Sequence, residues 1–73
     1  MSSAKIDKLV RMANQIGDFF APQPEPKAAE GVANHLKRFW TPKMISEILV
    51  RSAEADSGLN PTAARGVTLL KID

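Results

Sequence analysis

Five prolines impose the strongest constraint on how this 73-residue chain can fold. A proline inside a helix removes a backbone donor, clashes with the preceding turn and pushes the residue before it out of the helical region. Three of the prolines fall between residues 21 and 26, and the other two lie in the pairs Thr41-Pro42 and Asn60-Pro61. The chain is therefore expected to break into four segments at these three places.

The segments between the prolines have the periodicity of amphipathic helices. Their apolar residues recur every three or four positions, which places them along one face of a helix. No segment alternates apolar and polar residues in the way that a half-buried strand does. The sequence thus predicts an all-α fold, a small bundle of three main helices plus a short C-terminal helix in a single domain. The expected boundaries are residues 4–20, 27–40, 42–56 and 61–71 for the helices, residues 21–26 for an extended proline-rich loop, and residues 1–73 for the domain.

Local signals indicate where some helices begin, end or touch. Thr41 and Asn60 are expected to cap the third and fourth helices, each followed by a proline at the first helical position. Gly58 is well placed to take the left-handed conformation that ends helices. Gly17 lies inside the apolar stripe of the first helix, where glycine costs about 1 kcal/mol relative to alanine. Its presence indicates the close approach of a second helix.

The residue types argue against an active site or a metal centre in this chain. It has no cysteine and a single histidine, so it cannot form a thiolate metal site or a disulfide. Its serines have no nucleophile-elbow context, its carboxylates fall mostly on polar faces, and its glycines form no phosphate-binding loop. No apolar run approaches the roughly 20 residues of a membrane span, and no signal-peptide pattern is seen. We expect a cytoplasmic protein with no catalytic, cofactor-binding or metal-binding residue of its own.

Some apolar residues project away from the predicted inward stripes. Met12 and Phe19 are seven residues apart and share a line roughly 100° from the middle of the first stripe. Val50 and Leu69 also project away from the stripes of their helices. All four are candidate contacts with another chain, although Met12 and Phe19 could equally be buried by a further helix of the same bundle.

The second helix ends in two adjacent aromatic residues, Phe39 and Trp40, which cannot both point straight inward. One of them is expected at the rim, where an aromatic side chain can anchor an interface. His35 lies one turn before Phe39 at the edge of the apolar arc, where its ring can pack. Asn14 and Gln15 fall on the polar face of the first helix, where most amides face water.

A small helical nucleic-acid-binding module is the alternative from another functional class. In that case the third helix, which follows the turn at Trp40-Thr41-Pro42, would be the recognition helix. The net charge is only +2, and the basic residues are scattered. Lys43 and Arg51 share the third helix with carboxylates that would face phosphates unfavourably, namely Glu47, Glu54 and Asp56. The charges therefore favour a protein that does not bind nucleic acid.

Three blocks of sequence together resemble the delta subunit of NAD-dependent, molybdenum-containing formate dehydrogenases. The first is MANQIGDFF at residues 12–20, the second is VANHLKRFWTPKM at residues 32–44, and the third is GLNP at residues 58–61. The resemblance extends over about residues 8–67 and departs from the family in the proline-rich loop and in the tail. It implies an accessory subunit that binds and stabilises the catalytic subunit of a soluble complex, or assists its maturation.

The resemblance also implies which cofactors the complex contains. The catalytic subunit would hold a molybdenum bis-molybdopterin guanine dinucleotide centre and iron–sulfur clusters, with FMN, NAD and further clusters bound by other subunits. None of these is expected in this chain, because iron–sulfur clusters require thiolates. Residues that match the family are expected either to face the catalytic subunit or to form the core that shapes that surface. Met12 is added because the helical projection places it away from the inward stripe. The full set is Met12, Asn14, Gln15, Phe19, Phe20, His35, Phe39 and Trp40.

Overall fold

The computed structural model describes residues 4–71 and contains four helices and no strand within them. The helices are α1 (Ala4–Phe20), α2 (Lys27–Phe39), α3 (Pro42–Ser52) and α4 (Pro61–Leu70). The all-α prediction is therefore confirmed.

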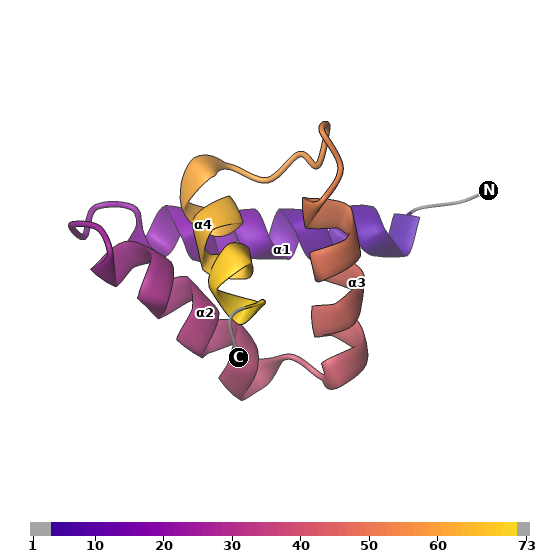
Figure 1. Ribbon diagram of the computed structural model, residues 1–73, viewed down its shortest axis with the longest axis horizontal. Coiled ribbons are helices and arrows are strands. Elements are labelled where there is room, and N and C mark those ends of the chain that lie inside the picture. The colour runs from indigo at the N-terminus through magenta and orange to yellow at the C-terminus, as the bar shows by residue number, and fades with distance from the viewer. Residues whose placement is uncertain (1–3, 72–73) are drawn as a thin grey trace.

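The helices pack around α4, which contacts the other three. In Figure 1 the long α1 runs across the molecule behind α4, while α2 and α3 extend from the two sides of α4 and are joined at the lower edge. The core lies where the four helices meet. Side chains from every helix are completely buried there, among them Ala13, Val32, Leu36, Ile48 and Val67. These residues belong to the apolar stripes that the sequence predicted.

The two proline-led helix starts have the predicted geometry. Thr41 and Asn60 have extended backbones, with φ of −72° and ψ of 158° and 165°. The Thr41 hydroxyl accepts a hydrogen bond from the Met44 N–H at 3.2 Å, and the Asn60 Oδ1 accepts one from the Ala63 N–H at 2.8 Å. A proline follows each cap, where its missing donor costs nothing. Local chemistry thus fixes where α3 and α4 begin.

Helix α3 is shorter than the sequence predicted, because it ends at Ser52 and not near Asp56. Residues 53–56 contain no large apolar side chain that a longer helix could bury, and Ala53 is exposed. The Ser52 hydroxyl donates a hydrogen bond to the carbonyl oxygen of Leu49 at 2.7 Å. Gly58 has the predicted left-handed conformation, with φ of 81°, but it lies in the loop before α4 and does not cap α3. Helices α2 and α4 end at Phe39 and Leu70, with Trp40 and Lys71 as their cap residues.

The proline-rich loop is compact, so the prediction of an extended connection is wrong. Its backbone makes turns, in which the Gln23 N–H donates to the Phe20 carbonyl at 2.9 Å. Prolines fit such turns because their fixed φ suits a turn position. Glu25 of this loop pairs with Arg65 of α4 at 3.3 Å. The connection between α1 and α2 therefore folds back against the bundle.

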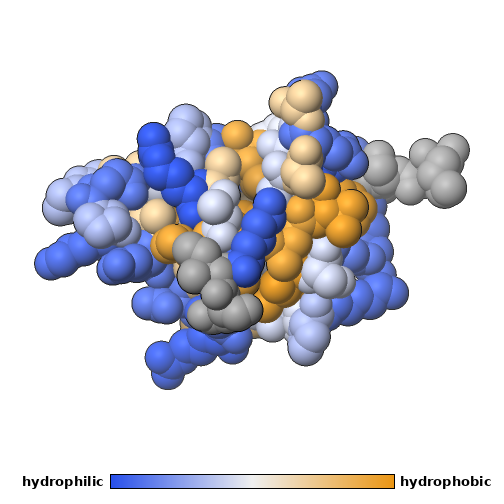
Figure 2. All heavy atoms as spheres, in the orientation of Figure 1, coloured by the Kyte–Doolittle hydropathy of each residue, from blue (hydrophilic) through white to orange (hydrophobic). Residues whose placement is uncertain are grey.

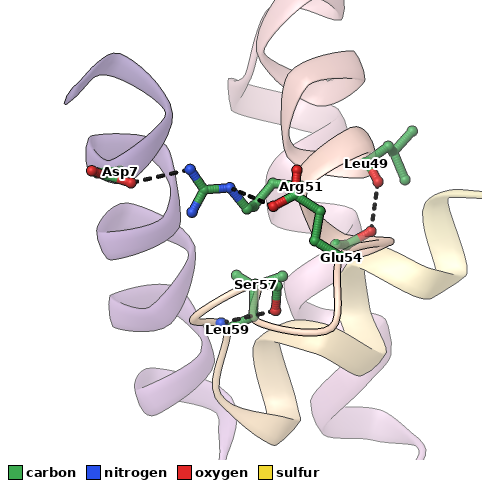
Figure 3. Close-up of polar contacts among 7 residues, drawn as sticks. Asp7, Leu49, Arg51, Glu54, Ser57 and Leu59 are labelled. Atoms are coloured by element: carbon green, nitrogen blue, oxygen red, sulfur yellow. Dashed lines mark hydrogen bonds and ion pairs between the residues drawn. The ribbon is translucent and has the colours of Figure 1, made fainter. Parts of the chain in front are cut away.

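A polar contact joins α1 to the far end of α3 (Figure 3). The Arg51 guanidinium reaches across to the Asp7 carboxylate at 3.1 Å and also lies 3.7 Å from Glu54. In the following loop, the Ser57 hydroxyl accepts a hydrogen bond from the Leu59 N–H at 3.2 Å. Arg51 thus joins the end of α3 to α1, and the Ser57 hydrogen bond lies within the loop before α4.

Candidate partner-binding groove

Helices α1 and α2 and the start of α3 form an open, mainly apolar groove of about 640 Å³. Ile16 and Met44, which the sequence did not single out, contribute to its lining. The lining also includes seven of the eight residues expected to face a partner or shape that surface: Met12, Gln15, Phe19, Phe20, His35, Phe39 and Trp40. Residues from separate parts of the sequence are thus brought together on one surface.

The α1 side of the groove contains both partly buried and exposed apolar residues. Gln15 and Ile16 lie three and four residues after Met12, and four and three residues before Phe19, so all four share one helix face. Met12 and Ile16 are partly buried and pack against the core, whereas 75% of Phe19 is exposed. The two alternatives for Met12 and Phe19 are thereby separated. Met12 contributes to the core edge, and Phe19 faces outward.

Phe20 packs against the ring of Phe19 and lies close to a glycine of the neighbouring helix. The two rings meet edge to face, with centroids 5.0 Å apart and an interplanar angle of 89°. A Cβ atom on Gly31 of α2 would lie 2.5 Å from Cδ1 of the Phe20 ring. The absence of a side chain at Gly31 lets the Phe20 ring pack directly on α2, and Phe19 in turn packs against that ring.

The α2 side is built from His35 and Phe39, whose ring centroids are 4.7 Å apart at an interplanar angle of 42°. Phe39 is 65% exposed, and the Arg38 guanidinium lies 5.9 Å from the centre of its ring. Trp40 is only 7% exposed. The prediction that one of these adjacent aromatics is buried and the other lies at the rim is confirmed, and the exposed residue is Phe39.

The end of α2 positions Trp40 as a wall of the groove. Trp40 leaves the helical conformation, with φ of −94° and ψ of 146°, while its N–H still donates to the Leu36 carbonyl at 2.9 Å. Thr41 then starts α3 by capping the Met44 N–H. Since the turn is this short, Met44 in the first turn of α3 reaches the same groove as Trp40.

Asn14 is the one predicted partner-facing residue that does not line the groove, and the expectation that its amide faces water is wrong. Its Oδ1 accepts a hydrogen bond from the Asn60 N–H at 2.8 Å, and its Nδ2 donates to the Gly58 carbonyl at 2.9 Å. The Asn60 Nδ2 in turn donates to the Asn14 carbonyl at 3.1 Å and to Asp18 at 3.1 Å. Asn14 therefore ties α1 to the start of α4. Gln15 beside it is exposed.

Gly17 allows α4 to approach α1, as the sequence predicted. A Cβ atom at this position would lie 2.7 Å from the Asn60 Oδ1 and 2.9 Å from the Ala63 nitrogen. Both distances are too short for a carbon atom, so any larger residue would displace the α4 start. This contact places α4 against one face of α1 and leaves the face with Met12 and Phe19 to the groove.

A second apolar area lies between α3 and α4 (Figure 2). Figure 2 shows apolar side chains gathered between these two helices and over part of α3. Ile45, Leu49 and Leu69 are partly buried and pack against the core, so the expectation that Leu69 projects away from the core is wrong. Val50 does project outward and is 68% exposed. Val50 is the only large exposed apolar residue within residues 4–71 outside the groove.

The groove has a mainly apolar lining and lacks the ligands of an iron–sulfur cluster. Gln15 and His35 are its only polar lining residues. Residues 4–71 contain no group of three or more His, Asp or Glu that could hold a metal ion, and the full sequence has no cysteine. Iron–sulfur clusters require several thiolates, so the residues of this chain do not fit them. Within the same range, no helix has the length and hydropathy needed to cross a membrane.

The fold and the groove define a small helical bundle that presents exposed aromatic side chains on one surface. The family model of the NADH-dependent formate dehydrogenase delta subunit, FdsD, matches residues 8–67. The chain therefore belongs to the family of formate dehydrogenase delta subunits, as the three sequence blocks indicated. Neither the curated proteins nor the solved structures include a match to this chain.

Proposed function

We propose that this chain is an accessory subunit that binds the molybdenum-containing catalytic subunit of an NADH-dependent formate dehydrogenase through the groove. The observation that carries the proposal is the exposure of Phe19 and Phe39 on a surface whose other lining residues are mainly packed apolar side chains. Membership of the delta-subunit family supports the choice of partner. In this proposal, the chain stabilises the catalytic subunit or assists its maturation in the cytoplasm.

The energetics of the groove favour its burial by another protein. Covering a fully exposed phenylalanine contributes about 1.5–3 kcal/mol, and Phe19 and Phe39 are both mostly exposed. Interface energy is usually concentrated in a few such anchors surrounded by well-packed neighbours. Phe20, Trp40 and Met44 supply those neighbours, because they are already held by the fold. The groove is therefore preformed, and binding of a partner side chain costs little free energy for reorganising it.

The proposal assigns formate oxidation and electron transfer to other subunits. The cofactors that such a complex requires, a molybdenum centre with iron–sulfur clusters, flavin and NAD, would be bound there. Isolated chain is then expected to turn over neither formate nor NAD. An assay of the purified chain for formate-dependent NAD reduction checks this point directly.

The positions of the charges disfavour the alternative of nucleic-acid binding through α3. Arg51, one of the two cations on this helix, is held by Asp7 and Glu54. Its side chain is only 18% exposed. Lys43 remains available, but one cation gives little phosphate affinity. A gel-shift assay at low salt is expected to detect no salt-dependent binding, and a salt-dependent shift would favour the alternative.

The experiment that tests the proposal is affinity purification of the tagged full chain from its native cytosol, followed by identification of the bound proteins. Co-purification of a large molybdenum-containing subunit, with formate-dependent NAD reduction in the eluate, is the expected result. A Phe19→Ser variant should remain helical, because this residue is exposed, but should lose the partner. A Val50→Ser variant, altered at the other large exposed site, should retain it. Recovery of the chain without any catalytic subunit would contradict the proposal.

A further inference from the structure

Three exposed cations from three helices flank the groove. Lys8 lies four residues before Met12 and seven before Gln15, so it continues the groove face of α1 toward its start. Arg38 lies over the exposed ring of Phe39. Lys43 immediately precedes Met44 in the first turn of α3. The groove therefore has an apolar floor and a rim that carries positive charge.

No carboxylate of residues 4–71 forms an ion pair with the rim cations Lys8, Arg38 and Lys43. Four carboxylates are engaged elsewhere by side chains of Arg51, Asn60 or Arg65: Asp7, Asp18, Glu25 and Glu54. The arrangement leaves unneutralised positive charge beside the groove.

The start of α3 adds to this positive field. Its first turn contains no acidic residue and includes Lys43. The N-terminal end of a helix carries a partial positive charge, which acidic residues usually offset. Glu47, one turn after Met44, is the nearest carboxylate on this helix, and its Oε1 is shielded from solvent without a hydrogen-bond partner among the described residues. The first turn of α3 therefore carries Lys43 without an acidic residue beside it.

We propose that the groove binds an amphipathic helix of the catalytic subunit whose apolar face is flanked by aspartate or glutamate residues. This inference rests on the proposed function and specifies the chemistry of the partner segment. Two neighbouring helices with apolar facing residues form the kind of groove that accepts a third helix through side chains at three- and four-residue spacing. Its apolar residues contact Phe19, Phe39 and Trp40, and its carboxylates lie opposite Lys8, Arg38 and Lys43. Opposite charges across the rim speed association and fix orientation.

A pair of charge-reversal variants tests the electrostatic part. The first combines Lys8→Glu and Lys43→Glu at the rim. The second combines Arg65→Glu on α4 with Lys71→Glu at the C-terminal cap of α4, away from the groove. All four positions are exposed, and both variants change the net charge equally. Association with the purified catalytic subunit is measured by biolayer interferometry at several salt concentrations. The rim variant is expected to associate about tenfold more slowly at low salt, with a flatter salt dependence.

The outcomes separate this inference from the proposed function. Equal slowing by both variants would show that only net charge matters, and unchanged association of the rim variant would show that the rim is not used. Either result overturns the inference about the rim. The proposed function still stands in that case, provided that the unmodified chain binds the catalytic subunit. Failure of the unmodified chain to bind the catalytic subunit would overturn both.

Cross-linking identifies the bound segment independently of any effect of the charge variants on folding. The photoreactive residue benzoylphenylalanine replaces Phe39 in the groove or, as the matched control, Val50 on α3. The Phe39 position is expected to cross-link to a segment of the catalytic subunit with apolar residues at helical spacing and flanking carboxylates. The Val50 position is expected not to cross-link to that segment. Cross-linking of the Phe39 position to a basic or uncharged segment would overturn the inference.

Discussion

Replacing Gly17 by alanine is expected to destabilise the protein, although alanine favours a helix. The intrinsic gain is about 1 kcal/mol, because alanine restricts the unfolded chain more than glycine does. Against this, the new Cβ would lie 2.7 Å from the Asn60 Oδ1, 2.9 Å from the Ala63 nitrogen and 3.1 Å from the Ala63 Cβ. Two of these atoms belong to the start of α4, including a backbone atom, so α4 must move away from α1.

The size of the effect follows from what the displaced helix loses. Forcing an extra carbon into a packed contact costs about 1–3 kcal/mol. Movement of Asn60 also weakens its two hydrogen bonds to Asn14, each worth about 1 kcal/mol. After subtraction of the helix-forming gain, the Gly17→Ala variant should lose about 2 kcal/mol of unfolding free energy. For a domain of this size, such a loss lowers Tm by roughly 8–16 °C.

Urea unfolding followed by far-UV circular dichroism measures the change, with Gly31→Ala as the comparison. At Gly31 the new carbon would lie 2.5 Å from the ring of Phe20, so it meets a side chain and not the backbone of a neighbouring helix. The Gly31→Ala variant should therefore lose less stability than Gly17→Ala. A Gly17→Ala variant as stable as the unmodified chain would refute the assignment of Gly17 to a close helix contact.

Three further substitutions test other contacts. Asn14→Ala should lower the free energy of unfolding by about 1–3 kcal/mol, because two side-chain hydrogen bonds disappear. Gln15→Ala next to it should lower it by less than about 0.5 kcal/mol. Equal urea midpoints for the two variants would contradict the role of Asn14. Thr41→Ala should cost about 1 kcal/mol through loss of the α3 cap, and an unchanged Tm in a thermal scan would count against that cap. Arg51→Ala should cost no more than about 1 kcal/mol, since Asp7 is half exposed, and the difference should shrink in high salt when urea unfolding is repeated there.

Local sequence signals account for most of the fold. Proline positions and apolar periodicity act over a few residues, so they predicted the four helices and the caps at Thr41 and Asn60. The close approach at Gly17 was also predicted, because glycine is unfavourable in a helix without such a reason. The end of α3 was predicted too late, since helical spacing continues through Ala53 although no large apolar residue follows to be buried.

Contacts between distant segments explain what the sequence did not predict. Asn14 lies on a polar helix face, and only the path of the loop before α4 brings Asn60 and Gly58 to it. Likewise, Met44 joins the groove because α3 turns back beside α1, which no local pattern specifies. Seven of the eight residues chosen as partner-facing or surface-shaping nevertheless line one groove, since they share helix faces that sequence spacing does define. Their binding role stays a prediction.

The affinity of the catalytic subunit for the full chain and for its Phe39→Ala variant tests the central claim most directly, with Val50→Ala as the control. Both residues are exposed, at 65% and 68%, so neither substitution should alter folding. We expect tight binding of the unmodified chain, a loss of about 2 kcal/mol for Phe39→Ala, equivalent to a roughly 30-fold rise in Kd, and unchanged affinity for Val50→Ala. Equal affinities for the unmodified chain and the Phe39→Ala variant would contradict the assignment of the groove as the partner-binding surface.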